Sequence, residues 1–194
     1  MSTHPLTRFV YETFGQQFGD LLLAGYGAGP GGGRRKLYLT ESEGEAEAAW
    51  VIELVATRPP CGDEPLVLAA LLKLLLSGLI ISQRLEFKLS ELLAELQWRD
   101  DSSARRQVEK AIVAYVRLFY DKRVDARAGR RAPEMEGGGC YHLLTGYIRG
   151  LRSGTDAVPD RITRGVYFDT GFIEGLKQGR VCFAGINFGP IQSS

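Results

Sequence analysis

The chain has 194 residues, of which 44% are hydrophobic and 24% are charged, so it is long enough to bury a sizeable core. Its formal net charge of +1 does not by itself indicate nucleic-acid binding, because residues 1–100 are acidic on balance and residues 101–194 are basic. The longest apolar run, Leu66–Leu76, is interrupted by Lys73 and falls short of the about 20 residues that cross a bilayer, so we expect no membrane contact.

The N-terminus and the cysteines exclude two further classes of protein. The opening MSTHPLTRF lacks the basic start and apolar centre of a secretory signal, which predicts a cytoplasmic protein. Cys61, Cys140 and Cys182 are odd in number and widely spaced, and the chain has only two histidines. This pattern favours neither a disulfide framework nor a metal site, and we expect no metal and no cofactor.

The first third of the chain predicts a helix followed by a hairpin. Apolar residues at spacings of three or four predict a helix over Leu6–Leu23. The glycine-rich run Gly25–Gly33 predicts a flexible loop, and it is no phosphate-binding loop because an extended run follows it instead of a helix. Arg35–Thr40 and Ala49–Ala56, joined by an acidic turn, predict a β-hairpin.

A helix that is apolar nearly all round is predicted next. Asp63 can cap it, Pro65 suits its first turn, and Gly78 can end it. Leucines occur on every side of Pro65–Ser77, so we expect this helix at the centre of the core.

Two more helices are predicted after a short extended piece, Arg84–Phe87. Leu89–Leu96 places its leucines on one face. A polar connection leads to Ser103–Tyr120, which Asp101 or Ser102 can cap and whose apolar stripe includes Phe119.

The remaining chain alternates loops and strand-like runs. After a polar, glycine-rich stretch, Cys140–Leu151 predicts a strand, and Arg164–Phe172 predicts another. Together they predict a long hairpin arm. Phe172–Lys177 predicts a short helical turn, and residues 183–194 are expected to be a C-terminal tail, truncated from a longer chain.

The basic excess is concentrated in one segment. Nine basic residues and three acidic ones occur between Arg105 and Arg131. The basic ones are Arg105, Arg106, Lys110, Arg117, Lys122, Arg123, Arg127, Arg130 and Arg131. This segment is a candidate for phosphate contact, and the alternative is a solvated surface that only aids solubility.

The order of elements predicts an α+β fold. Three helices, the last two joined by a short polar turn and followed by a β-hairpin, are typical of a winged helix-turn-helix, here with an N-terminal β-hairpin and a long β-hairpin wing. We divide the chain into an N-terminal helix and glycine-rich loop (1–33), a winged-helix domain (34–182) and the tail (183–194).

The last predicted helix is the candidate DNA-reading element. A helix about 10–12 Å across fits the major groove of B-DNA, which is about 12 Å wide, and its N-terminal side chains reach base edges. The major-groove candidates are Ser103, Arg105, Arg106, Gln107 and Lys110, and the backbone candidates on the wing are Arg123, Arg127, Arg130 and Arg131. The alternative is a small α+β domain whose basic residues are merely solvated.

The run from Pro65 to Arg123, followed by GCYHLLTGYIRGL and GVYFDTGFIEGLKQG, resembles the first winged-helix domain of RepA-type plasmid replication initiators. The resemblance covers roughly residues 35 to 180. It implies sequence-specific binding to double-stranded DNA at origin repeats, a homodimer, and a host initiator or helicase as partner. Such initiators usually carry two winged helices, and this chain supplies one clear one.

Two other functions are compatible with the same predicted architecture. One is an interaction module that dimerises through the Trp50 hairpin and the Val67 helix, and the other is a transcriptional regulator. We expect no enzymatic activity. Glu91 and Glu95 form a solvated acidic pair, and the tyrosines lack the histidine cluster that rolling-circle nucleases use to bind metal.

Overall fold

The computed structural model describes residues 4–29, 36–43, 46–124, 139–151 and 163–192. The helices are α1 (Pro5–Leu22), α2 (Glu64–Ser77), α3 (Leu89–Leu96), α4 (Ser102–Arg117) and α5 (Thr170–Lys177). The strands are β1 (Lys36–Glu43), β2 (Ala46–Val55), β3 (Arg84–Phe87), β4 (Phe119–Val124), β5 (Gly139–Tyr141), β6 (Leu144–Leu151), β7 (Thr163–Phe168), β8 (Arg180–Phe183) and β9 (Ile186–Pro190). This is a mixed α and β fold with antiparallel sheets.

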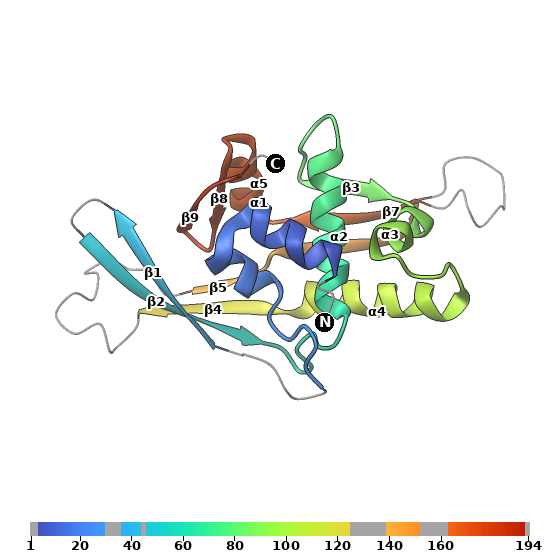
Figure 1. Cartoon of the computed structure of the whole chain (residues 1–194), viewed down its shortest axis with the longest axis horizontal. Coiled ribbons are helices and arrows are strands. Elements are labelled where there is room, and N and C mark those ends of the chain that lie inside the picture. The colour runs from blue at the N-terminus through green and yellow to red at the C-terminus, as the bar shows by residue number, and fades with distance from the viewer. Residues whose placement is uncertain (1–3, 30–35, 44–45, 125–138, 152–162, 193–194) are drawn as a thin grey trace.

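Helix α2 lies at the centre, as its composition predicts. Every residue from Leu66 to Leu72 is buried, which covers nearly two full turns. Contacts with α1, α3, α4 and β3 surround it (Figure 1). Asp63 occupies the N-cap position but makes no side-chain capping bond; the neighbouring Glu64 carboxylate instead accepts from the Cys61 amide at 3.0 Å.

The four-stranded sheet has the order β1-β2-β4-β5, all antiparallel. Inward residues lie opposite one another: Leu54 is paired with Tyr120, and Ile52 with Lys122. All four are buried, so alternation on both strands places one face of the sheet against the core. The strand β4 therefore joins the N-terminal hairpin as its third strand.

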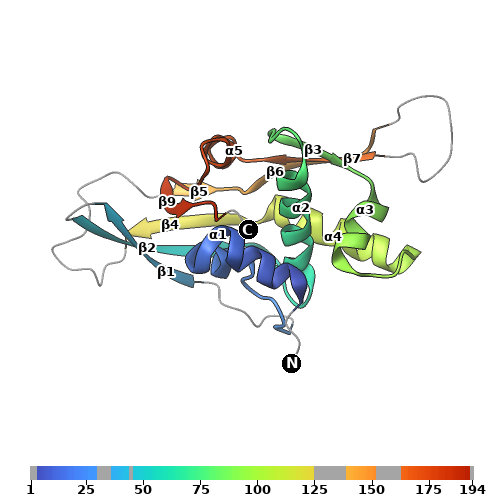
Figure 2. The ribbon, with the colours of Figure 1, turned by 45° about the horizontal axis from the view of Figure 1, so that its top comes forward.

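The three-stranded sheet has the order β3-β7-β6 and lies at the end of the molecule that holds α3 and α4 (Figures 1 and 2). The strands predicted at Cys140–Leu151 and Arg164–Phe172 do pair with each other, because β6 and β7 are antiparallel neighbours. The predicted strand Cys140–Leu151 breaks at His142 and Leu143, with β5 in one sheet and β6 in the other. Buried Leu143 accepts a bond from the Asp169 amide at this break, which ties it to the start of α5.

The predicted third helix ends three residues early. Helix α4 stops at Arg117, and Phe119 and Tyr120 begin β4 instead of extending the helical stripe. Leu118 has extended backbone and a fully buried side chain, so it turns the chain from the helix into the sheet without leaving the core.

The described part of the glycine-rich loop is held against the segment before α2. The Gly27 amide donates to the Gly62 carbonyl at 3.0 Å, and the Gly62 amide donates to the Ala28 carbonyl at 2.9 Å. Gly25 has a positive φ of 89° and approaches the Pro60 carbonyl so closely that a Cβ would lie 2.2 Å from its oxygen. Glycine is required at this position for both reasons.

Residues 183–190, expected as part of a tail, contribute to β8 and β9, which form an antiparallel hairpin. Val181, Phe183 and Ile186 are buried there because the hairpin covers α1 and α5. The Gln192 amide donates to the Thr13 carbonyl of α1 at 3.0 Å. The N-terminal helix and the C-terminal hairpin thus share one hydrophobic cluster with the middle of the chain. The division at residues 33 and 182 stays a prediction.

Phe18 joins these terminal elements. It is fully buried, and its ring contacts those of Phe14, Phe172, Phe183 and Phe188, from α1, α5, β8 and β9. We expect Phe18→Ala to lower the free energy of unfolding by about 3–5 kcal/mol, because it removes a buried ring and leaves a cavity. Urea denaturation measures this loss. Arg99→Ala, at an exposed arginine before α4, serves as control and should change stability little; equal losses would contradict the packing described.

Candidate nucleic-acid interface

Helix α4 begins with a well-formed cap. The Asp101 carboxylate accepts from the backbone amides of Ser103 at 2.8 Å and Ala104 at 2.9 Å. Asp101 is therefore the capping residue of the two alternatives that the sequence left open. The cap satisfies amides that would otherwise lack a partner at the exposed end of the helix.

Arg105 is tied to the residue before the cap. Its Nε and Nη2 donate to the two carboxylate oxygens of Asp100 at 2.5 and 2.8 Å. The hydrogen bond from Arg105 lowers the pKa of Asp100 below its ordinary value. Because this two-pronged pair neutralises much of its charge, Arg105 braces the turn between α3 and α4 as well as presenting a cation.

The side of α4 that faces away from the core is polar and basic. Val108, Ala111, Ile112 and Tyr115 make up the buried stripe. The exposed residues on the opposite side are Ser103, Arg106, Lys110 and Arg117, with Gln107 beside them. Successive members of this stripe are three, four and seven residues apart, which places them on one face of the helix. Arg106 donates to the Ser102 carbonyl at 3.1 Å. The structure thus brings four of the predicted major-groove residues to one exposed surface.

Glu109 fastens α4 to the three-stranded sheet. Its carboxylate lies 3.2 Å from Arg164 Nη2 on β7 and accepts from the Tyr147 hydroxyl of β6 at 3.2 Å. Burial, and then the Glu109 charge, raise the pKa of Tyr147 to about 12. The Arg164 and Glu109 side chains are only 17% and 27% exposed, so this cluster is shielded enough to fix the helix on the sheet.

Of the four predicted wing residues, Arg123 is the one that the described part of the chain includes. Arg123 is on β4, opposite Val51 of the N-terminal hairpin, and forms ion pairs with Asp121 and Glu53. Arg123 therefore lies within a strand, between β2 and β5, and is not part of the β6–β7 hairpin. Arg127, Arg130 and Arg131 lie outside the described residues.

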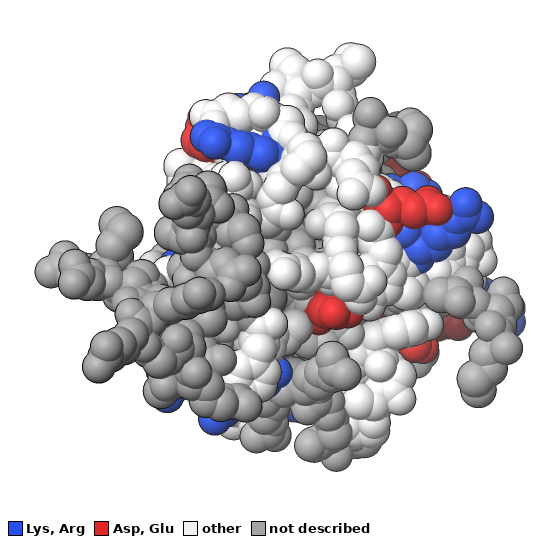
Figure 3. Space-filling view, turned by 60° about the vertical axis from the view of Figure 1, so that its left-hand side comes forward, with Lys and Arg blue, Asp and Glu red and all other residues white. Residues whose placement is uncertain are grey.

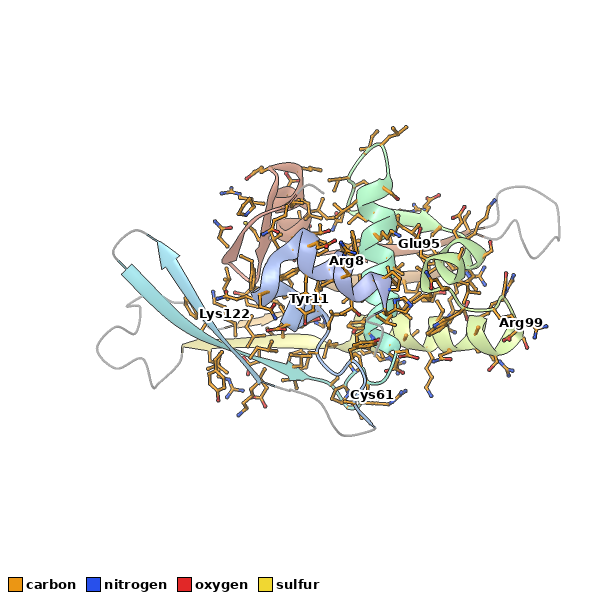
Figure 4. All side chains as sticks on the ribbon, viewed as in Figure 1. Arg8, Tyr11, Cys61, Glu95, Arg99 and Lys122 are labelled. Atoms are coloured by element: carbon orange, nitrogen blue, oxygen red, sulfur yellow. The ribbon has the colours of Figure 1, made fainter. Side chains whose placement is uncertain are left out.

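Lys122, counted in the basic segment, is buried. Its ammonium lies 3.7 Å from the centre of the Trp50 ring and donates to the Ala184 carbonyl at 3.0 Å. The lysine joins the four-stranded sheet to the β8–β9 turn, where Ala184 has a positive φ of 53°. Figure 4 shows Lys122 on the sheet side of the molecule, far from Arg99 at the start of α4. The charge of Lys122 therefore stabilises the packing of these elements and is not accessible to a ligand.

A pocket of about 310 Å³ opens beside the C-terminal half of α4. Its lining consists of Ala56, Thr57, Arg58, Lys110, Val113, Ala114 and Arg117. Neither Arg58 nor Arg117 is among the predicted DNA-contacting residues, although Arg117 belongs to the basic segment predicted to meet phosphate. The spacing of seven between Lys110 and Arg117 was a usable signal for Arg117, whereas Arg58 reaches α4 only through the tertiary structure.

The face at the opposite end of the molecule has a different character. Among the atoms described in Figure 3, basic side chains are scattered and lie beside acidic ones, with broad uncharged areas between them. The unpaired basic stripe of α4 therefore has no counterpart on the described part of that face.

The described residues include no cluster of metal ligands. No group of three His, Cys, Asp or Glu among them could hold a metal ion, and Cys61, Cys140 and Cys182 are free thiols. Tyr115 and Tyr120 are buried, and desolvation raises the pKa of both hydroxyls. No described helix has the length and apolar character needed to cross a membrane.

Neither a protein-family profile nor a curated protein sequence matches the chain. Solved structures of domains 2 and 3 of RctB share its fold. One, a selenomethionine derivative, has a TM-score of 0.54 and 12% identity, covering 91% of this chain and 61% of that one. Another has a TM-score of 0.53 and 15% identity, with 80% and 57% covered. This chain spans about three fifths of those structures, and at such identities the likeness shows the fold alone.

The Asp101 cap can be tested directly. We expect Asp101→Ala to lower the free energy of unfolding by about 1 kcal/mol and to speed hydrogen exchange of the Ser103 and Ala104 amides, because both lose their acceptor. The matched control is Asp63→Ala, at the N-cap position of α2, where the side chain makes no capping bond. The assignment is contradicted if the two variants lose the same stability.

Proposed function

We propose that this protein binds double-stranded DNA, in a sequence-specific manner, at a plasmid replication origin. The observation that carries the proposal is the stripe of exposed Ser103, Arg106, Gln107 and Lys110 at the capped start of α4. The likeness to RctB domains 2 and 3 supports an initiator-like fold. The resemblance of the sequence to RepA-type initiators adds the plasmid origin and its repeats as the target.

Within this proposal, α2, α3, α4 and the sheet β3-β7-β6 form a winged helix-turn-helix. The order of helices and strands fits that architecture once the β4–β5 pair is treated as an insertion. The wing is then the β6–β7 hairpin, which does not include Arg123 of β4. Its base lies next to α4, because Glu109 binds Arg164 and Tyr147.

The roles of the α4 side chains follow from their surroundings. Arg106 and Gln107, in the first two turns, are proposed to reach base edges, and Ser103 is proposed to meet a phosphate at the helix N-terminus. Lys110, one turn further on, has no ion pair among the described residues and is proposed to contact the DNA backbone. Arg105 stays in the interface, with Asp100 holding its guanidinium in place.

The test starts with a duplex that the full chain selects from a random-sequence library. We expect Arg106→Glu to weaken binding to this duplex by at least about tenfold and to reduce its preference over mixed-sequence DNA, because a base contact and a cation are both lost. Fluorescence anisotropy at two salt concentrations measures both quantities. Lys177→Gln on α5 is the control and should bind as the wild type does. If the wild type shows no salt-dependent binding to any duplex, the proposed function is wrong.

A second proposal concerns partners, and rests on the turn between α2 and β3. Leu79 is fully exposed and Ile80 is 81% exposed there. Of the two residues that marked the dimerisation surfaces in the sequence, Val67 is fully buried and Trp50 is 5% exposed, so neither side chain is offered to a partner. We propose that a homodimer covers the Leu79–Ile80 turn, and that a host initiator or helicase is an alternative occupant.

Sedimentation of the full chain over a range of concentrations tests this partner proposal. We expect the wild type to form dimers and Ile80→Ser to shift the equilibrium toward monomer, because less apolar area is removed from water. Arg99→Gln, an exposed change in the connection between α3 and α4, should leave the equilibrium unchanged. A wild type that stays monomeric throughout would contradict the homodimer.

A further inference from the structure

The pocket beside the C-terminal half of α4 combines an apolar floor with a basic rim. Ala56, Val113 and Ala114 supply the floor, whereas Arg58, Lys110 and Arg117 supply the charge. The two cations on α4 are seven residues apart, so they lie on one face, roughly 10 Å from each other along the helix axis.

The three cations differ in how they are held. Arg58 is anchored: its Nη2 donates to the Glu64 carboxylate at 2.6 Å, and Glu64 is itself buried. The side chain of Arg58 is still 48% exposed. Neither Lys110 nor Arg117 has a hydrogen-bond or ion-pair partner among the described residues. The rim therefore offers one preoriented guanidinium and two cations whose charge is not neutralised by this part of the chain.

We propose that this pocket binds the sugar–phosphate backbone of duplex DNA, next to the bases read by the first turns of α4. The apolar floor suits the carbon face of a deoxyribose, and the rim suits the phosphates on either side of it. Phosphates follow one another every 3.4 Å of helix axis along one DNA strand, so a separation of roughly 10 Å lets Lys110 and Arg117 reach different phosphates.

The pocket also continues the surface already proposed for DNA. Lys110 belongs to both, and Arg117 follows it on the same side of α4. In Figure 4, Arg99 marks the N-terminal end of α4, while Cys61, three residues after Arg58, lies near its other end. One DNA strand that crosses the helix would thus meet Ser103 at one end and Arg58 at the other. This inference rests on the proposed function and adds a contact that carries no sequence information.

The test compares two probes, the duplex selected by the full chain and a mixed-sequence duplex of the same length. We expect Arg117→Gln to weaken binding to both by the same severalfold factor. The slope of log K against log salt concentration should fall by about 0.9, the value for one lost phosphate contact. Ala114→Glu keeps a good helix former but places a carboxylate on the pocket floor, and should weaken both complexes further. Arg8→Gln on α1, an exposed arginine paired with Glu12, is the control and should change neither affinity nor slope.

The remaining outcomes of these binding measurements contradict different parts of the proposal. If Arg117→Gln and Ala114→Glu bind both duplexes as the wild type does, the pocket is no backbone site, while the proposed function survives. If Arg117→Gln alters the preference between duplexes with an unchanged salt slope, Arg117 reads bases instead. If a polyglutamate peptide binds the wild type, and these variants lose the peptide but not DNA, the pocket serves an acidic protein segment. Failure of the wild type to bind any duplex overturns the proposed function and this inference together.

Discussion

A helix that is apolar on every side can be stable in water only when other elements surround it, and α2 sets this requirement for the whole molecule. Its residues from Leu66 to Leu72 are all buried, and α1, α3, α4 and β3 contact it. Each surrounding helix turns its own apolar stripe toward α2 and leaves its other side to solvent. The exposed basic stripe of α4 is therefore a consequence of burial: Ile112 and Tyr115 must face inward, so Lys110 and Arg117 face outward.

Tertiary structure sorts the basic residues of one sequence segment into three groups. Lys122 is buried over Trp50, where its charge meets an aromatic face and a carbonyl. Arg105 and Arg123 are paired with carboxylates from near and distant parts of the chain. Lys110 and Arg117 keep their charge without a partner among the described residues. Arg106 donates only to the Ser102 carbonyl and is likewise without an ion pair among the described residues. A count of charges along the sequence treats all six alike, whereas these last three are the ones whose charge is not paired within the described part of the chain.

The helices were predictable because the signals that specify them are local. Spacing of apolar residues located α1, α2, α3 and α4 closely, and Asp101 caps α4 as its chemistry requires. The hairpin of β1 and β2 was predicted for the same reason, since a short acidic turn joins its strands. The partner of β4 was not predictable. Its choice of β2 depends on Leu54 and Ile52 lying opposite Tyr120 and Lys122, across a long stretch of chain.

The sequence by itself determined the helices, the apolar centre of the molecule and the start of α4 as the place where exposed basic residues gather. These follow from periodicity and capping, which act over a few residues. Only the tertiary structure decided the two-sheet topology, the burial of Lys122 and the position of Arg58 beside Arg117. Each of these depends on contacts between residues far apart in the chain. The residues next to a strand or a cation do not indicate which distant residue it will contact.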